Sequence, residues 1–212
     1  AGLINSGEYE EALSWILEAE KAYHTDDLFD NSRSVLSYNL ILEAMNNGTA
    51  DQVDHVMQQY SRYLNPGEAA VLNALREEEN LKAAIETLPF DQALRLVQDS
   101  LDRGAIEQQR GIALLVYLYS LEVNRQWAAG EFVSAYTLVR DADQNLRRNS
   151  DFRTLLRTAS ENAVVYFHNR AAALVAEKRY EEALNLVQEG LSLIPTSAVL
   201  IKDRNIIQSA LP

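Results

Sequence analysis

The residues best suited to metal binding or acid–base chemistry are three histidines, and their spacing keeps them apart. His24, His55 and His168 are distant in sequence, none has a second ligand at the helical i, i+4 spacing, and no H-E-x-x-H motif occurs. His24 is followed by Asp26 and Asp27, an oxygen-rich set, but the segment lacks the glycine and the spacing of an EF-hand and fits a loop between helices. We therefore expect no bound metal.

Other catalytic arrangements are also missing from the sequence. Glu77, Glu78 and Glu79 are consecutive, so on a helix they point about 100° apart and cannot work as paired carboxylates. There is no G-x-S-x-G nucleophile elbow and no glycine-rich phosphate cradle, and the absence of cysteine excludes thiolate chemistry and disulfides. The sequence predicts neither an enzyme nor a cofactor, and a small-ligand site would need a convergent polar cluster that it does not show.

Composition indicates an acidic, helical, soluble protein. The 212 residues carry 31 acidic and 19 basic side chains, a net charge of −12, and all of the acidic excess lies in the first half. Such a surface repels phosphate, so we expect no nucleic-acid partner. No apolar run approaches the ~18 to 20 residues of a membrane span, so no membrane insertion is expected. Four prolines and eight glycines are too few for the turns of an all-β chain. The compartment stays open between cytoplasmic and exported bacterial.

One cadence of small and apolar residues recurs along the chain. Between Arg170 and Pro195 these residues repeat at three- and four-residue spacing on both sides of a break at Lys178, which predicts a helical hairpin. Ala183 and Gly190 would lie where its two helices touch. Similar second helices begin at Tyr9, which follows Gly7, and at Phe90 and Phe132. A further unit is expected to turn at Asn46–Gly48 and to pack through Val53, Met57 and Tyr60.

The hairpin resembles the tetratricopeptide repeat, a unit of ~34 residues with small or aromatic residues at fixed positions. The matching residues are Phe167, Ala171, Leu174, Ala183, Val187, Gly190 and Pro195. The resemblance implies an all-α fold: a right-handed α-solenoid of stacked helical hairpins with a C-terminal capping helix. It also implies a concave groove that binds a peptide or protein segment without catalysis.

Domain organisation follows from the repeat cadence. We expect a single solenoid domain over residues 1–212, with hairpins at 1–30, 33–66, 68–105, 108–148 and 154–195. Residues 197–211 would form the cap, covering the last hairpin with Val199, Leu200, Ile206, Ile207 and Ala210. Ala1 falls within a repeat, so we expect the chain to be part of a longer parent.

A second helical stripe is the candidate binding surface. Tyr117, Ser120, Asn124 and Trp127 lie at three-, four- and three-residue spacing. The resemblance implies that this face lines the groove, with Val165 and His168 at corresponding positions in the next repeat. The alternative is that the C-terminal helix or a neighbouring chain covers the stripe. The family's clamp for acidic C-termini is missing, since only Asn124 and Asn169 match it.

Two functions remain open at this point. The first is a protein–protein interaction scaffold that binds a basic or neutral peptide or protein segment at Tyr117, Ser120, Asn124, Trp127, Val165 and His168. The second is a structural or oligomerisation module, in which the N-terminal end and the Tyr117–Trp127 stripe pack against copies of the chain or the rest of its parent. Molecular mass in solution discriminates the two.

Overall fold

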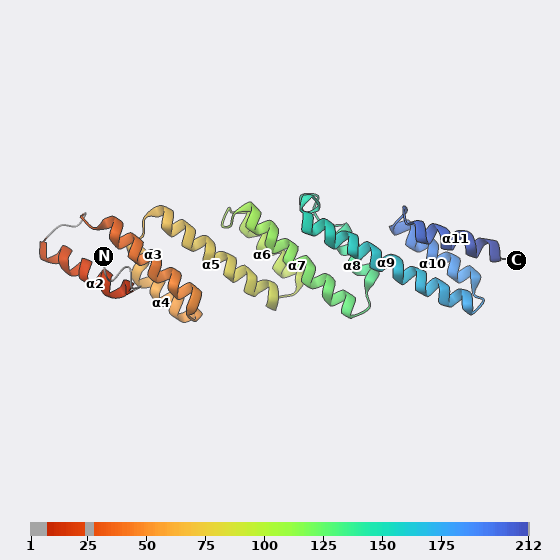
Figure 1. The fold of residues 1–212 in the computed structure, drawn as a ribbon, viewed down its shortest axis with the longest axis horizontal. Coiled ribbons are helices and arrows are strands. Elements are labelled where there is room, and N and C mark those ends of the chain that lie inside the picture. Colours follow the sequence, from red (N-terminus) through yellow and green to blue (C-terminus); the bar gives the residue numbers. More distant parts are fainter. Residues whose placement is uncertain (1–7, 24–27, 212) are drawn as a thin grey trace. The chain divides into compact units, whose positions relative to one another are not determined.

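The computed structural model describes residues 8–23 and 28–211, and the residues described are all-helical (Figure 1). Within them lie ten α-helices, two short 3-10 helices and no strand, so the all-α expectation is confirmed. The expectations that involve Gly7, His24, Asp26 and Asp27 lie outside the described residues. The helices are α2 Tyr9–Tyr23, α3 Asp30–Asn47, α4 Ala50–Tyr60, α5 Pro66–Thr87, α6 Phe90–Asp102, α7 Gln108–Ala128, α8 Phe132–Arg140, α9 Ser150–Ala176, α10 Tyr180–Leu193 and α11 Ala198–Ala210, with 3-10 turns η1 Ser61–Tyr63 and η2 Leu146–Arg148.

The chain divides into two compact units. Unit 1 comprises Ala1–Thr87 with Gln98–Arg110, and unit 2 comprises Leu88–Val97 with Gly111–Pro212. Helix α6 therefore contributes its beginning to unit 2 and its end to unit 1.

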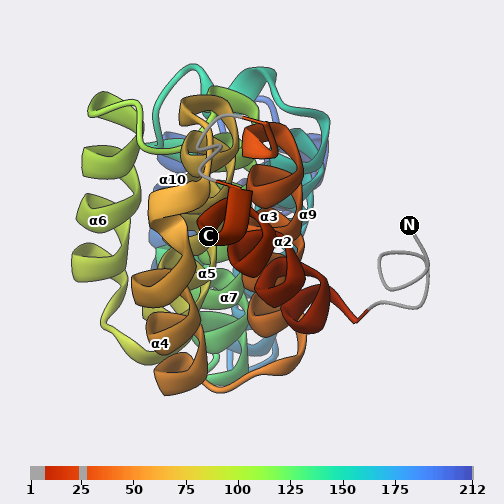
Figure 2. The ribbon, with the colours of Figure 1, turned by 90° about the vertical axis from the view of Figure 1, so that its left-hand side faces the viewer.

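The core of unit 1 forms around α3, which packs against α2, α4 and α5 (Figure 2). Its fully buried side chains include Leu13 from α2, Leu36 and Ile41 from α3, and Leu72 from α5. The inner face predicted for α4 is confirmed, because its central side chains join this core: Val53, Met57 and Tyr60.

The turn between α3 and α4 follows from its residue types. Gly48 caps α3, and a Cβ atom there would lie 2.7 Å from the carbonyl oxygen of Ala44. Thr49 then starts α4 with a capping box. Its hydroxyl accepts a hydrogen bond from the backbone N–H of Gln52, and the Gln52 side-chain oxygen accepts one from the backbone N–H of Thr49 at 2.7 Å. The turn predicted at Asn46–Gly48 is correct only at Gly48: Asn46 and Asn47 still belong to α3, and Gly48 and Thr49 form the turn.

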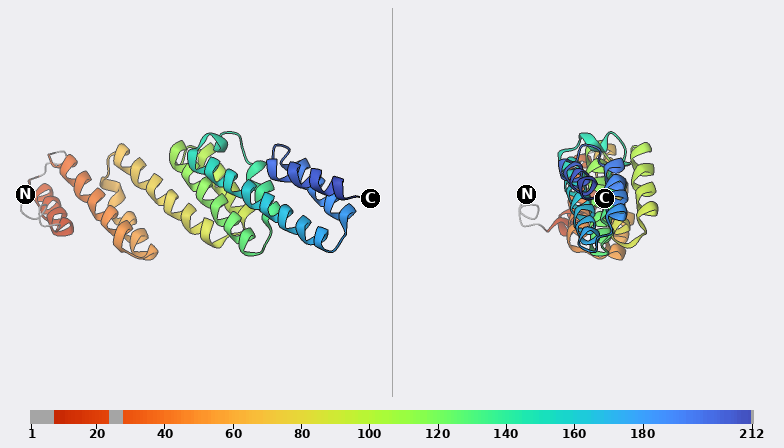
Figure 3. Two further views of the ribbon diagram at one scale, coloured as in Figure 1. Left: turned by 45° about the vertical axis from the view of Figure 1, so that its right-hand side comes forward. Right: turned by 90° about the vertical axis from the view of Figure 1, so that its right-hand side faces the viewer.

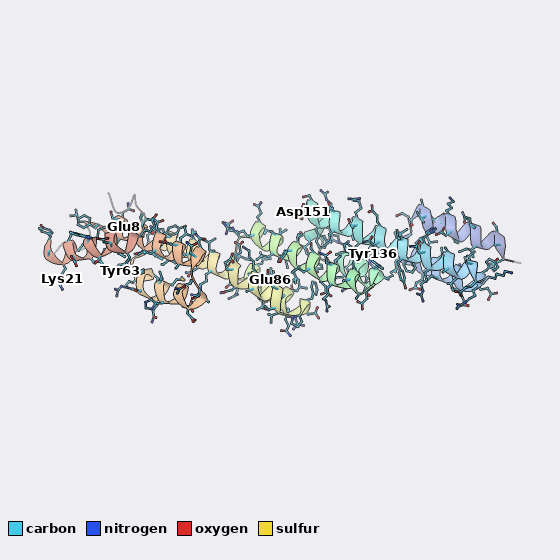
Figure 4. All side chains as sticks on the ribbon, turned by 60° about the horizontal axis from the view of Figure 1, so that its bottom comes forward. Glu8, Lys21, Tyr63, Glu86, Tyr136 and Asp151 are labelled. Atoms are coloured by element: carbon cyan, nitrogen blue, oxygen red, sulfur yellow. The ribbon has the colours of Figure 1, made fainter. Side chains whose placement is uncertain are left out.

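Unit 2 is centred on the long helix α9, which packs against α8, α10 and α11 (Figure 3). Aromatic side chains contribute to its core: Tyr119, Tyr136 and Phe167 are all buried. The Tyr119 ring makes edge-on contacts with Phe90 at 5.1 Å and Phe152 at 5.3 Å between ring centroids. Tyr136, labelled in Figure 4, donates to the carbonyl oxygen of Leu193 and so links α8 to the end of α10.

The α9–α10 hairpin has the predicted close contact. Ala183 is fully buried, and Gly190 is so crowded that an added Cβ would lie 2.8 Å from Leu200 Cδ1 and 2.9 Å from Phe167 Cγ. Small residues at both positions allow α10 to approach α9 and α11 closely. Lys178, in the turn, takes a left-handed backbone conformation with φ 63°.

Helix α11 does cover the hairpin, but with fewer side chains than predicted. Leu200 and Ile207 are buried against α9 and α10. Val199, Ile206 and Ala210 do not cover the hairpin: Val199 is 45 % exposed, Ile206 is 55 % exposed and Ala210 is also exposed. Val199 directly precedes the buried Leu200, and Ile206 directly precedes the buried Ile207. One residue step rotates a side chain about 100° around the helix, so both point away from the core.

Candidate binding surface

The three consecutive glutamates contact different sets of partners in unit 1, and Glu78 and Glu79 share Lys82. Glu77 accepts hydrogen bonds from Ser100 on α6 and from Arg103 just after α6, whereas Glu78 pairs with Lys82 at 3.1 Å and Arg110 at 2.8 Å. Glu79 takes the other contact of Lys82, at 2.8 Å. Through these contacts Glu77 connects α5 to Ser100 of α6, and Glu78 connects α5 to Arg110 at the beginning of α7.

Glu78 gives this unit a pH-dependent contact. Burial alone would raise the pKa of its carboxyl, but hydrogen bonds from Lys82 and Arg110 outweigh burial and hold the pKa below its ordinary value. Because the folded-state pKa is the lower one, the stabilisation is complete above roughly pH 4.3 and is lost as the pH falls through the folded-state value.

Replacing Glu78 with glutamine should therefore destabilise unit 1 most at neutral pH. We expect the difference in unfolding free energy between wild type and Glu78→Gln to shrink towards zero as the pH falls through the lowered folded-state pKa, where the wild-type carboxyl also becomes neutral. Urea unfolding of both proteins at several pH values measures this difference in unfolding free energy. Glu43→Gln, at an exposed position of α3, is the matched control. If the loss of unfolding free energy caused by Glu78→Gln stayed constant with pH, the lowered pKa of Glu78 would be contradicted.

The described residues form neither a metal cluster nor a helix suited to a bilayer. Across residues 8–23 and 28–211, no group of three or more histidine, cysteine or acidic side chains is placed to hold a metal ion. No helix in the described part is long and apolar enough to cross a membrane.

The predicted stripe occupies one side of α7, in unit 2. The opposite side is buried through residues such as Leu114, Leu118 and Val123. On the stripe, Tyr117 is 41 % exposed and Asn124 is exposed. Ser120 is half-buried, and its hydroxyl donates to the Val116 carbonyl at 2.8 Å. The stripe thus offers an aromatic ring and an amide, while the serine is satisfied within its own helix.

Trp127 ends the stripe with an apolar surface. The residue is half-buried, and its only polar side-chain atom, Nε1, is buried with no hydrogen-bond partner among the described residues. What the indole exposes is therefore carbon. Beside it, Glu122 accepts from Arg125 and Gln126 at 2.8 Å, and these bonds hold the pKa of Glu122 below its ordinary value, with the Arg125 hydrogen bond the largest cause. The charges nearest the stripe are thus neutralised along the helix.

The two candidate residues on α9 have different surroundings. Val165 is 54 % exposed and free for contact. His168 is exposed, yet its ring Nδ1 lies 2.8 Å from Oδ2 of Asp203 on α11. The C-terminal helix therefore contacts one of the two candidate residues on α9 through an exposed hydrogen bond.

A hollow of about 580 Å³, which the sequence analysis did not anticipate, lies between α9 and α10. Helical phase places Arg170, one of its α9 residues, on the side away from Val165 and His168. Its central cation, Arg179, is held by Glu177 at 2.8 Å and by Glu182 at 2.6 Å. Three of the five charged side chains that line the hollow therefore pair with one another. The Arg179–Glu182 spacing of three residues was the one sequence signal for it.

Unit 1 has a second hollow, of about 630 Å³, beside Tyr63 (labelled in Figure 4). Arg62 and Arg33 lie over the Tyr63 ring, 4.7 Å and 5.8 Å from its centroid. Arg33 also pairs with the buried Glu20 at 2.9 Å and with Asp30. These contacts tie α2, α3 and η1 together, which gives the cluster a structural role.

No family model matches the chain, and neither a curated protein nor a solved structure matches it. The function is therefore inferred from the residues of the chain itself.

Proposed function

We propose that the chain is a tetratricopeptide-like solenoid of helical hairpins that binds a peptide or protein segment on the α7 stripe and carries out no catalysis. The observation that carries the proposal is the chemistry of that stripe. A half-exposed tyrosine and the carbon edge of a tryptophan flank an exposed asparagine on a helix whose opposite side is packed: Tyr117, Trp127 and Asn124. Half-exposed aromatic side chains of this kind are typical of protein-binding surfaces.

The stripe suits a peptide backbone more than a charged group. The Asn124 side chain makes no hydrogen bond within the described residues, and its amide can both donate to and accept from a peptide group. Val165 adds an exposed aliphatic side chain from α9. Glu122 and Arg125 already neutralise each other, so the bound segment would be neutral or, given the net charge of −12, basic.

Binding to the stripe can be followed through Trp127. The chain has two tryptophans, so Trp15→Phe leaves Trp127 as the only tryptophan reporter. Peptides selected from a displayed random library would be titrated against this variant, and we expect a shift in Trp127 emission. Adding Tyr117→Ala and Asn124→Ala should weaken binding at least tenfold, roughly 1.4 kcal/mol, without changing the melting temperature.

The control keeps the residue types and moves them off the stripe. Tyr23→Ala combined with Asn185→Ala removes the same two kinds of side chain from exposed positions elsewhere. This control should bind like the parent. The proposal fails if the selected peptides bind the stripe variant and the control equally tightly.

A further inference from the structure

Helix α2 exposes an acidic face with a tryptophan at its centre. The buried side of α2 runs through Ala12, Leu13 and Glu20. On the opposite side, Glu11, Trp15 and Glu18 follow one another at four- and three-residue spacing, and Trp15 is 64 % exposed. Neither carboxylate forms an ion pair with a described residue. We name these three residues the α2 face; Glu8 and Lys21, labelled in Figure 4, lie near the two ends of the same helix.

Helix α11 exposes a face of the opposite kind. Val199, Lys202 and Ile206 follow one another at three- and four-residue spacing on the side turned away from the buried Leu200 and Ile207. The Lys202 ammonium forms no ion pair within the described part of the chain. Nearby, Asp203 is already bonded to His168. The three residues, named the α11 face, therefore present one cation between two aliphatic side chains, beside a shallow hollow lined by Ala198, Ile201, Lys202, Asn205, Ile206 and Ser209.

The two faces are complementary in charge and in apolar content. On α2 an aromatic ring lies between two carboxylates, and on α11 an ammonium lies between two aliphatic side chains. Packed together, Lys202 could reach Glu11 or Glu18, or lie over the Trp15 ring, while Val199 and Ile206 cover the indole. Each face alone leaves large apolar side chains in water.

We propose that the chain associates with a second copy of itself, the α2 face of one copy packing on the α11 face of the next. The contact is heterologous, because it joins two different surfaces, and a dimer therefore retains one unused α11 face on one copy and one unused α2 face on the other. Association can therefore continue beyond a dimer, into chains or rings. This inference uses neither the α7 stripe nor the peptide that would bind there.

The strength of the contact follows from its size. One helix face against another buries less than the ~800 Å² per partner of a standard stable interface. We expect a dissociation constant of roughly 10 to 100 µM. Sedimentation velocity of the full chain between about 5 µM and 1 mM should then show a mass that rises with concentration. A monomer over that whole range would overturn the inference.

Mixing two variants tests the geometry of the contact. Trp15→Glu removes the α2 face, and Ile206→Glu removes the α11 face, so each variant alone should remain monomeric. In an equimolar mixture, the intact α11 face of the first can still meet the intact α2 face of the second. We expect a heterodimer that grows no further, with the wild-type affinity per contact. A mixture that stays monomeric, or one that forms longer oligomers, overturns the arrangement.

Two further measurements test whether the contact lies on these two faces. Leu96→Glu, which places the same charge at an exposed aliphatic position of α6, should associate like the wild type. Trp127→Phe leaves Trp15 as the only tryptophan, and its emission should move to shorter wavelength as mass increases. Growth in mass without that change would place the contact elsewhere and overturn the inference. Since peptide binding is read from Trp127 and self-association from Trp15, either can fail alone.

Discussion

Replacing Gly190 with valine should lower the free energy of unfolding of the C-terminal unit by about 3 kcal/mol. A Cβ at this position would lie 2.8 Å from Leu200 Cδ1 and 2.9 Å from Phe167 Cγ, both inside van der Waals contact. The leucine methyl can rotate, but the Phe167 ring is buried on all sides and must shift with its helix. Denaturant unfolding, followed by hydrogen exchange in α9 and α10, measures the loss.

A graded series separates overpacking from helix propensity. Gly190→Ala should cost roughly 1 kcal/mol, because about the same amount gained in helix propensity offsets part of the clash. Gly67→Ala is the matched control: the nearest atom to its Cβ would be Asn65 Oδ1 at the ordinary distance of 3.4 Å, so stability should stay equal or rise slightly. If Gly190→Val unfolded at the wild-type midpoint, the close contact between α10 and its neighbours would be wrong.

The packing of individual hairpins could be predicted from the sequence because it depends on local spacing. Ala183 and Gly190 share one side of a helix by periodicity alone, and their small size already indicates a close approach. Met57 and Tyr60 follow the same logic in α4. At the turn before α4, Gly48 and Thr49 are residue types that end one helix and begin the next.

Contacts between distant segments could not be predicted in this way. His168 meets Asp203 from 35 residues away, and Glu78 meets Arg110 from 32 residues away. Their partners depend on how whole helices are placed, which no local spacing determines. This hydrogen bond gives His168 a structural contact in addition to its proposed place on the binding surface, because its ring joins α9 to α11.

Which side of helix α11 faces the core could not be predicted from the sequence either. Its apolar residues come as neighbouring pairs, Val199 with Leu200 and Ile206 with Ile207. A pair of this kind spans about 100° of helix surface, so the sequence alone does not say which member faces the core. The structure buries the second member of each pair and exposes the first. One side of α11 therefore covers the last hairpin, and the other side forms the α11 face.

Emptying the buried side of α11 should loosen the C-terminal unit. Leu200→Ala and Ile207→Ala each remove a fully or nearly fully buried side chain that packs with Phe167, Ala171 and Val187. We expect each substitution to cost about 3 kcal/mol, the usual range for such cavities. Helix α11 should then detach before the rest of the unit unfolds, which increases hydrogen exchange in α11 first and in α9 and α10 next.

The exposed side of α11 supplies the control for this prediction. Val199→Ala combined with Ile206→Ala removes two aliphatic side chains of similar size from the same helix, but from positions 45 % and 55 % exposed. Because these side chains contribute little to the core, stability and exchange should stay within about 0.5 kcal/mol of the wild type, while self-association through the α11 face should weaken. If the Val199→Ala and Ile206→Ala double variant lost as much stability as Leu200→Ala or Ile207→Ala, the buried and exposed sides of α11 would have been assigned wrongly. Unchanged exchange in α9 and α10 after Leu200→Ala and Ile207→Ala would mean that α11 does not protect the hairpin beneath it.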